Sequence, residues 1–229
     1  LQLINTAILM SQGVLIMSTY EKEADENKPQ TKALANRMLQ IYLLLSVPII
    51  LGLSVFGTLL IKYITTPEYL NGALVIPFMG FSSIFTVLFV LTGYGMDLKL
   101  KTNYYFWMML VAASINVLLN FYFIPHFGFL GAGITTLMCN LLYWAMAYYY
   151  SQRFFYVKRN LKSILIYLLI TFVLSVFVPI MEIQFSYPIH FFYKCLILVA
   201  GLLLPFLVGI VSVNDLNQFK KMALDQIKK

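Results

Sequence analysis

Charged side chains are scarce in this sequence. Asp, Glu, Lys and Arg make up 11% of its 229 residues, against roughly 25% in soluble domains. So few charges cannot cover the surface of a globule in water, which excludes an ordinary soluble domain. Hydrophobic residues reach 61%, and a lipid bilayer can cover a surface of that kind. The sequence therefore predicts a membrane protein.

Metal-binding and catalytic motifs are also lacking. Cys139 and Cys195 lie within apolar runs and lack the spacing of a metal or redox pair, while His126 and His190 each stand alone. A membrane polymerase or ligase would carry a large external loop with catalytic residues, whereas the outer connectors here have about ten residues or fewer. We expect no cofactor, no metal site, no catalytic residue and no enzymatic activity.

Acidic residues are absent from the middle of the apolar runs. Proton- or sodium-coupled transport usually needs an embedded carboxylate, and no embedded Arg is present to hold a phosphate through two hydrogen bonds. Any coupling or anion-binding charge is therefore expected elsewhere. The nine acidic residues are Glu21, Glu23, Asp25, Glu26, Glu68, Asp97, Glu182, Asp215 and Asp225.

The apolar residues form blocks long enough to cross a bilayer, which takes about 20 residues. We expect spans at 1–19, 40–64, 72–96, 103–124, 128–150, 163–181 and 190–213. Barrel strands would alternate apolar and polar residues, and these runs are apolar on all sides. The prediction is an all-α polytopic bundle of about seven spans: five within 1–150, two more within 151–213, and an amphipathic cytoplasmic tail at 214–229.

Lysine and arginine alternate from connector to connector. Cytoplasmic loops retain these residues, so the loops at 20–39, 97–102 and 151–162 and the C-terminal tail are expected on the inside. The net charge of +7 is explained by an anionic inner leaflet and needs no nucleic acid. Lys62 and Lys194 depart from the pattern, and we expect both to extend toward the outer interface.

The segment 116–133 reads NVLLNFYFIPHFGFLGAG. Asn116 and Asn120 are one turn apart, so both amides share one helix face. Pro125 is expected to end that helix at the outer surface. The glycines that follow allow a tight reversal and a close approach of the next helix. The sequence therefore predicts a helical hairpin with almost no outer loop.

This pattern resembles the polysaccharide-transporter family, the O-antigen and capsule flippases of the multidrug/oligosaccharidyl-lipid/polysaccharide exporter superfamily. The resemblance rests on Asn-x-x-x-Asn, Ile-Pro, Phe-Gly and Gly-Ala-Gly-Ile-x-Thr, on the inside loop YEKEADENKPQTKALANRM, on the outer turn Pro-Glu-Tyr and on the inside loop DLKLKTNYY, all in the family's order. It covers roughly residues 1–160, and the remainder matches by hydropathy alone.

The resemblance implies the C-terminal lobe of a two-lobe exporter in a bacterial cytoplasmic membrane. Such a protein moves an undecaprenyl-pyrophosphate-linked oligosaccharide outward by alternating access. The implied partners are this lipid-linked oligosaccharide, membrane lipid, an N-terminal lobe of the same protein and, as a candidate, a polysaccharide polymerase. The chain begins with Leu inside a hydrophobic helix, without an initiator Met or a signal peptide, so we expect a fragment of a longer protein.

Amides are the candidates for lining the substrate path. Gln2, Asn5 and Gln12 are spaced to share one face of the first span, and the family places the corresponding helix beside its cavity. Hydrogen bonding between helices is the alternative interpretation for these three. For Asn116 and Asn120 packing within the hairpin is the stronger interpretation, as it is for Asn140.

Three other functions stay open at this point. A multidrug exporter of the same superfamily would share the lobe, although the Asn-Pro-Gly hairpin favours the polysaccharide branch. A lipid II exporter would be expected to carry more embedded charge. A truncated chain could also be an inactive fragment.

Overall fold

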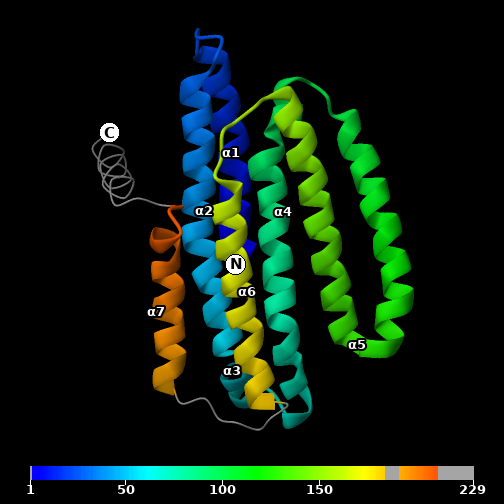
Figure 1. The fold of residues 1–229 in the computed structure, drawn as a ribbon. Helices are drawn as coiled ribbons and strands as arrows, with labels where there is room; N and C mark the ends of the chain where they lie inside the picture. The colour runs from blue at the N-terminus through cyan, green and yellow to red at the C-terminus, as the bar shows by residue number, and fades with distance from the viewer. Residues whose placement is uncertain (1, 184–190, 211–229) are drawn as a thin grey trace.

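The computed structural model describes residues 2–183 and 191–210, and of residues 2–4, 7–12 and 67 it describes the backbone alone. Every regular element in this part of the chain is helical (Figure 1), so the predicted all-α fold is confirmed. The predicted amphipathic tail at 214–229 lies outside the described residues. The helices are α1 (Gln2–Lys22), α2 (Pro29–Val55), α3 (Gly57–Ile64), α4 (Val75–Leu98), α5 (Asn103–Phe154), α6 (Leu161–Ile183) and α7 (Phe191–Leu207), with a 3₁₀ helix η1 (Pro67–Leu74) before α4.

Within the described ranges, four helical segments are long and apolar enough to cross a membrane. They are α2, Glu68–Leu98, α5 and α6. Several boundaries differ from those expected; the helix of the last span, expected over 190–213, ends at Leu207. The span at 40–64 is interrupted at Phe56, which has φ −95° and ψ 2° and separates α2 from α3. Helix α2 already begins at Pro29, so the connector expected over 20–39 is much shorter.

Helix α5 has 52 residues and folds back on itself as a hairpin of two arms (Figure 1). The hairpin is confirmed, but Pro125 does not end the first arm as expected. The chain reverses at Gly128, whose φ of 57° and ψ of −136° lie in a region open to glycine. The arms then approach closely, because a Cβ at Gly131 would lie 2.3 Å from the carbonyl oxygen of Phe123.

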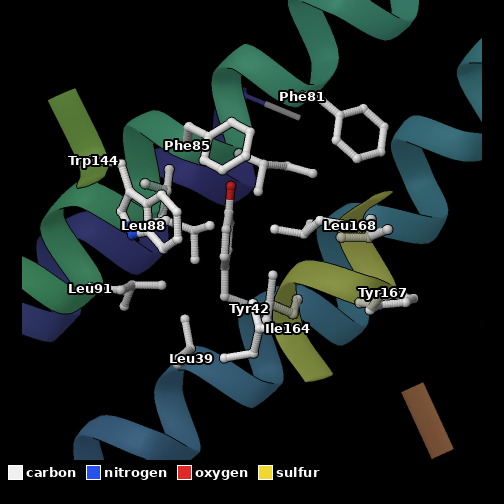
Figure 2. Packing of buried hydrophobic residues seen from close by; sticks show 14 of the residues in the cluster. Leu39, Tyr42, Phe81, Phe85, Leu88, Leu91, Trp144, Ile164, Tyr167 and Leu168 are labelled. Atoms are coloured by element: carbon white, nitrogen blue, oxygen red, sulfur yellow. The ribbon is translucent and has the colours of Figure 1, made fainter. Parts of the chain in front are cut away.

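Helix α2 lies at the centre of the bundle, packed against α1, α4, α6 and α7. Its Tyr42 is fully buried, and Figure 2 shows the ring passing between side chains of α4 and α6. The core around it is built from large apolar residues, among them Leu43, Phe81, Leu88, Trp144 and Leu168. Helix α5 packs on the other side of α4 and makes its main contacts there.

The helices come close where a glycine faces a neighbour. A Cβ at Gly95 of α4 would lie 2.6 Å from both the carbonyl oxygen and the Oγ of Ser151 in α5. The Gly95 N–H donates a hydrogen bond to Ser151 Oγ at 3.0 Å. Small residues allow such contact between helices in a membrane, and this one fixes the second arm of α5 on α4.

The connectors after α1, α4 and α5 lie at one end of the bundle, drawn at the top of Figure 1. The reversal of α5 and the α3–η1 segment lie at the other end. The first end carries Lys22, Lys28, Lys99, Lys101 and Lys158, so the basic connectors are together in space as the alternation predicts. We call it the basic end; its cytoplasmic location stays a prediction.

At the basic end the short α1–α2 connector is closed by Glu23. Its carboxylate accepts hydrogen bonds from the backbone N–H of Gln30 at 2.6 Å and of Thr31 at 3.0 Å, and from the Thr31 hydroxyl at 2.7 Å. These donors belong to the first turn of α2, whose dipole also favours a negative charge. Burial opposes ionisation of Glu23, but the Thr31 hydroxyl, the two N–H groups and the charge of Lys28 lower its pKa below the ordinary 4.5.

We expect replacement of Gly95 by Ala to destabilise the protein. The added methyl group would overlap the backbone of α5, and overpacking of this kind costs about 1–3 kcal/mol. Thermal unfolding in detergent, followed by circular dichroism, measures the effect. Gly13→Ala is the matched control, because no atom lies within 4 Å of a Cβ there. An equal change in the two variants would contradict the close contact.

The stabilisation that the Glu23 cap gives to the fold should depend on pH. Because folding lowers the pKa of the Glu23 carboxyl, this stabilisation is fully present at a pH above the ordinary pKa of 4.5. It is lost as the pH falls through the lower pKa of the folded protein. The ¹⁵N–¹H resonance of Thr31, followed from about pH 6.5 to about pH 3, should titrate with a midpoint below 4.5. Thr31→Val removes one donor and should raise that midpoint. A wild-type midpoint above 4.5 would contradict the cap.

Candidate functional site

Two adjacent serines of α4 connect the bundle through hydrogen bonds to amides on both sides. Ser83 Oγ accepts from Asn5 Nδ2 of α1 at 2.8 Å, and Ser82 Oγ accepts from Asn140 Nδ2 of α5 at 2.6 Å. The Tyr42 hydroxyl of α2 donates to Asn5 Oδ1 at 3.3 Å. These contacts form a polar row through helices that are otherwise apolar, and they link α1, α2, α4 and α5.

Asn5 is 9% exposed, and both polar atoms of its amide have partners within the bundle. Helix α1, which carries Asn5 in its first turn, begins near mid-height of the bundle (Figure 1). These are the contacts of an interhelical amide, and a position beside the substrate path stays a prediction. Gln2 and Gln12 belong to α1, but their side chains lie outside the described part of the structure.

In the hairpin, Asn116 and Asn120 contact each other as their spacing predicts. Asn120 Nδ2 donates to Asn116 Oδ1 at 2.9 Å, and the Thr135 hydroxyl of the second arm donates to Asn120 Oδ1 at 2.5 Å. The pair therefore joins the two arms of α5. Thr135, which is fully buried, was not among the residues expected at this site.

A groove with a volume of about 360 Å³ lies between the two arms of α5. One arm contributes Asn116 and the other contributes Asn140, so two amides line the same groove. Apolar side chains make up most of the remaining wall. The lining residues are Met109, Ala112, Ala113, Asn116, Val117, Thr136, Cys139, Asn140 and Tyr143.

A second groove, of about 370 Å³, continues from Val117 past Asn120 to Pro125. Of the predicted path residues, Asn116 and Asn120 thus line neighbouring grooves, and Asn5 reaches the same polar row from the other side of α4. Such a surface offers amides to hydroxyl groups and apolar walls to a hydrocarbon chain. Sequence reasoning assigned Asn140 to packing; its bond to Ser82 agrees, but its place in the groove was missed.

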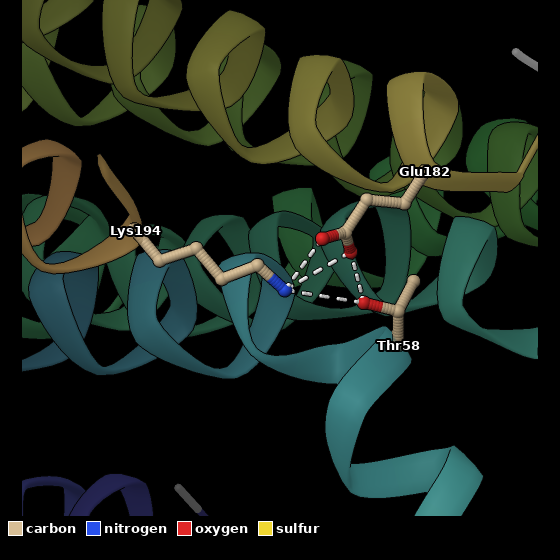
Figure 3. A network of polar contacts seen from close by, with 3 residues as sticks. All are labelled: Thr58, Glu182 and Lys194. Atoms are coloured by element: carbon tan, nitrogen blue, oxygen red, sulfur yellow. Dashed lines mark hydrogen bonds and ion pairs between the residues drawn. The ribbon is translucent and has the colours of Figure 1, made fainter. Parts of the chain in front are cut away.

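The expectation for Lys194 was wrong. It does not extend toward the interface but is 4% exposed, and Nζ lies 2.8 Å from Glu182 Oε1 (Figure 3). The Thr58 hydroxyl donates to Glu182 and lies 3.5 Å from Lys194 Nζ. The burial of a charge is tolerated where it is paired and hydrogen-bonded, and here the three residues join α3, α6 and α7. Lys62, by contrast, is exposed.

Comparison with known proteins supports a membrane protein without naming a function. No family model matches the chain, and no solved structure does. A curated relative, the uncharacterized membrane protein MJ1068 of Methanocaldococcus jannaschii, is 26% identical over 166 residues. The match covers 69% of this chain and 31% of the relative, so the chain spans about a third of that protein's length.

Removing one partner of the buried ion pair should be far more damaging than removing both. Lys194→Met leaves the Glu182 carboxylate buried without its counter-ion, which costs about 3–5 kcal/mol. Adding Glu182→Gln should restore most of the loss, because the uncompensated charge is gone. Thermal unfolding in detergent tests this, with the exposed Lys62→Met as the control. Equal stability of single and double variants would contradict the burial.

Proposed function

We propose that this chain forms the C-terminal lobe of an exporter that moves a lipid-linked oligosaccharide across the cytoplasmic membrane. The substrate would be an undecaprenyl-pyrophosphate-linked repeat unit of O-antigen, capsule or a related polysaccharide. The observation that carries the proposal is the groove of the α5 hairpin, where Asn116 and Asn140 face a cavity with otherwise mostly apolar walls. The order of motifs around that hairpin supports it.

The chemistry of the groove suits such a substrate. Sugar hydroxyls lose their water on leaving the surface and need hydrogen-bond partners inside, which amides supply as both donors and acceptors. The amides are neutral, so they would hold a headgroup weakly enough to release it. No bond needs to be made or broken, and the proposed activity is transport rather than catalysis.

The lobe is built to move as one body. Its core is continuous from α2 to α4 and α6, the polar row connects α1 and α5 to α4, and the ion pair holds α7. Alternating access would then be a rocking of this body against a second lobe. The charge of Lys194 is cancelled by Glu182, so Lys194 would not be the cation that meets the pyrophosphate.

We expect the longer protein required by this proposal to restore surface polysaccharide in a strain lacking its O-antigen flippase. Asn116→Leu and Asn140→Leu should each reduce the polysaccharide ladder about tenfold or more. Each variant removes a hydrogen bond to the bound sugar, and the loss of one such bond lowers affinity by about that factor. The ladder is scored by gel, with membrane expression measured in parallel. Asn71→Leu is the control, since Asn71 is an exposed amide on η1.

Several repeat-unit types should be tried in the same strain. A well-expressed protein that restores none of them contradicts the proposal. Resistance to a drug panel in place of polysaccharide recovery would point to a multidrug exporter instead. Loss of the ladder in Asn71→Leu as well would contradict the proposal that the groove binds the substrate.

A further inference from the structure

A second cavity lies at the basic end, away from the hairpin. It has a volume of about 140 Å³, several times the roughly 30 Å³ that one water occupies in the liquid. Helix α2, the start of α6, the connector between α5 and α6, and the chain following α7 surround it. The lining residues are Asn36, Leu39, Gln40, Leu43, Lys158, Arg159, Asn160, Ile164, Gly209 and Ile210.

Arg159 is held in place at this cavity by neutral partners. Its Nε donates to Asn36 Oδ1 at 3.1 Å, and Nη2 donates to the Tyr94 hydroxyl at 2.9 Å. The guanidinium also lies 5.6 Å from the centroid of the Tyr94 ring. These bonds use two of its five N–H donors, and no carboxylate of the described residues pairs with it. The charge is positioned but not neutralised.

The backbone around the cavity is fixed by Asn36 and Gln40, two side chains of α2. Asn36 Nδ2 donates to the carbonyl oxygen of Lys158 at 3.2 Å, which holds the connector against α2. Gln40 Nε2 donates to the carbonyl oxygen of Ile210 at 2.7 Å, which closes the side toward α7. Lys158 itself is exposed, so a second cation stands beside Arg159 at the mouth of the cavity.

The deeper wall is apolar, formed by Leu39, Leu43 and Ile164. A cationic mouth above an apolar wall, between helices at the basic end of a membrane bundle, fits a molecule with an anionic head and a hydrocarbon tail. A soluble anion would have no use for the apolar wall. We propose that this cavity binds the phosphate headgroup of a membrane lipid, with Arg159 and Lys158 as its cations.

Two lipids share this chemistry, an anionic phospholipid and a polyprenyl pyrophosphate. The inference goes beyond the proposed function, because a phospholipid site would exist in the protein whether or not it transports sugar. A polyprenyl pyrophosphate at the same place would make it an uptake site for the substrate. The test must therefore separate the two lipids from each other and from free phosphate.

The experiment is native mass spectrometry of the purified chain in detergent, titrated with phosphatidylglycerol, phosphatidylcholine, a polyprenyl pyrophosphate or inorganic phosphate. We expect an anionic lipid to bind at least about tenfold more tightly than phosphatidylcholine, and Arg159→Gln to remove about tenfold of that affinity. Lys158→Gln should weaken binding too, and its side chain is exposed, so folding is not at risk.

The matched control is Arg153→Gln. Arg153 is an exposed arginine at the same end, it donates to the Tyr149 hydroxyl, and it does not line the cavity. The control removes the same charge and should leave affinity within about twofold. Tyr94→Phe removes one bond to Arg159 but keeps its charge, and it should retain binding.

Binding of either lipid that depends on Arg159 and not on Arg153 supports the inference, and the preferred lipid identifies the source of the phosphate. Equal losses in Arg159→Gln and Arg153→Gln would show a general charge effect and overturn it. So would binding of inorganic phosphate as tight as that of the lipids. A protein that fails to restore polysaccharide but binds lipid in this way would contradict the proposed function alone.

Discussion

The structure depends on one constraint, the absence of water from the hydrocarbon interior of a membrane. A buried amide, hydroxyl or charge is then stabilised by a partner within the protein. Ser82 and Ser83 meet amides from two different helices, and Lys194 meets Glu182. Each of these contacts joins two different helices, so satisfying a polar group also positions a helix. Interhelical hydrogen bonds average only about 0.6 kcal/mol, so apolar packing supplies most of the stability while the polar contacts specify the arrangement.

Packing divides the bundle into a firmly held core and a less covered edge. Helix α2 is the most buried of the four long apolar segments, and Tyr42, Leu43 and Leu51 are inaccessible. The first arm of α5 is held on α4 at its start, where the Tyr105 hydroxyl lies 3.1 Å from the Gly93 carbonyl oxygen. Further along, Leu118 and Phe121 are 68% and 78% exposed. The groove that Asn116 and Asn140 line therefore lies between the second arm of α5, which is fixed to the core, and the first arm, which is held mainly through the hairpin. The first arm is the wall of the groove that can adjust to a ligand.

The sequence was sufficient for features that depend on neighbouring residues. Apolar blocks predicted helices, the alternation of lysine and arginine predicted which connectors lie together, and the Asn116–Gly133 pattern predicted the hairpin. It was insufficient where the outcome depends on the rotation of a helix about its axis. Helix α4 is apolar on all sides, so nothing local indicates that Ser82 and Ser83 face different partners. Glu182 and Lys194 lie on different helices, and pairing them requires knowing that both turn toward Thr58. The reversal lies at Gly128 instead of Pro125, because Gly128 has the positive φ that the turn requires.

The distribution of charge separates three environments along the bundle. At the end opposite the basic end, the charges of Lys194 and Glu182 neutralise each other. The middle of the bundle carries neutral amides. At the basic end, no carboxylate of the described residues pairs with Arg159. An anionic lipid headgroup would be attracted at the basic end, whereas the middle would offer it hydrogen bonds without ionic attraction. A path through a membrane must bind well enough to admit its cargo and weakly enough to release it. If the groove is part of the proposed transport path, a fixed and uncompensated cation there would hold a pyrophosphate midway; the groove residues that the structure describes include none.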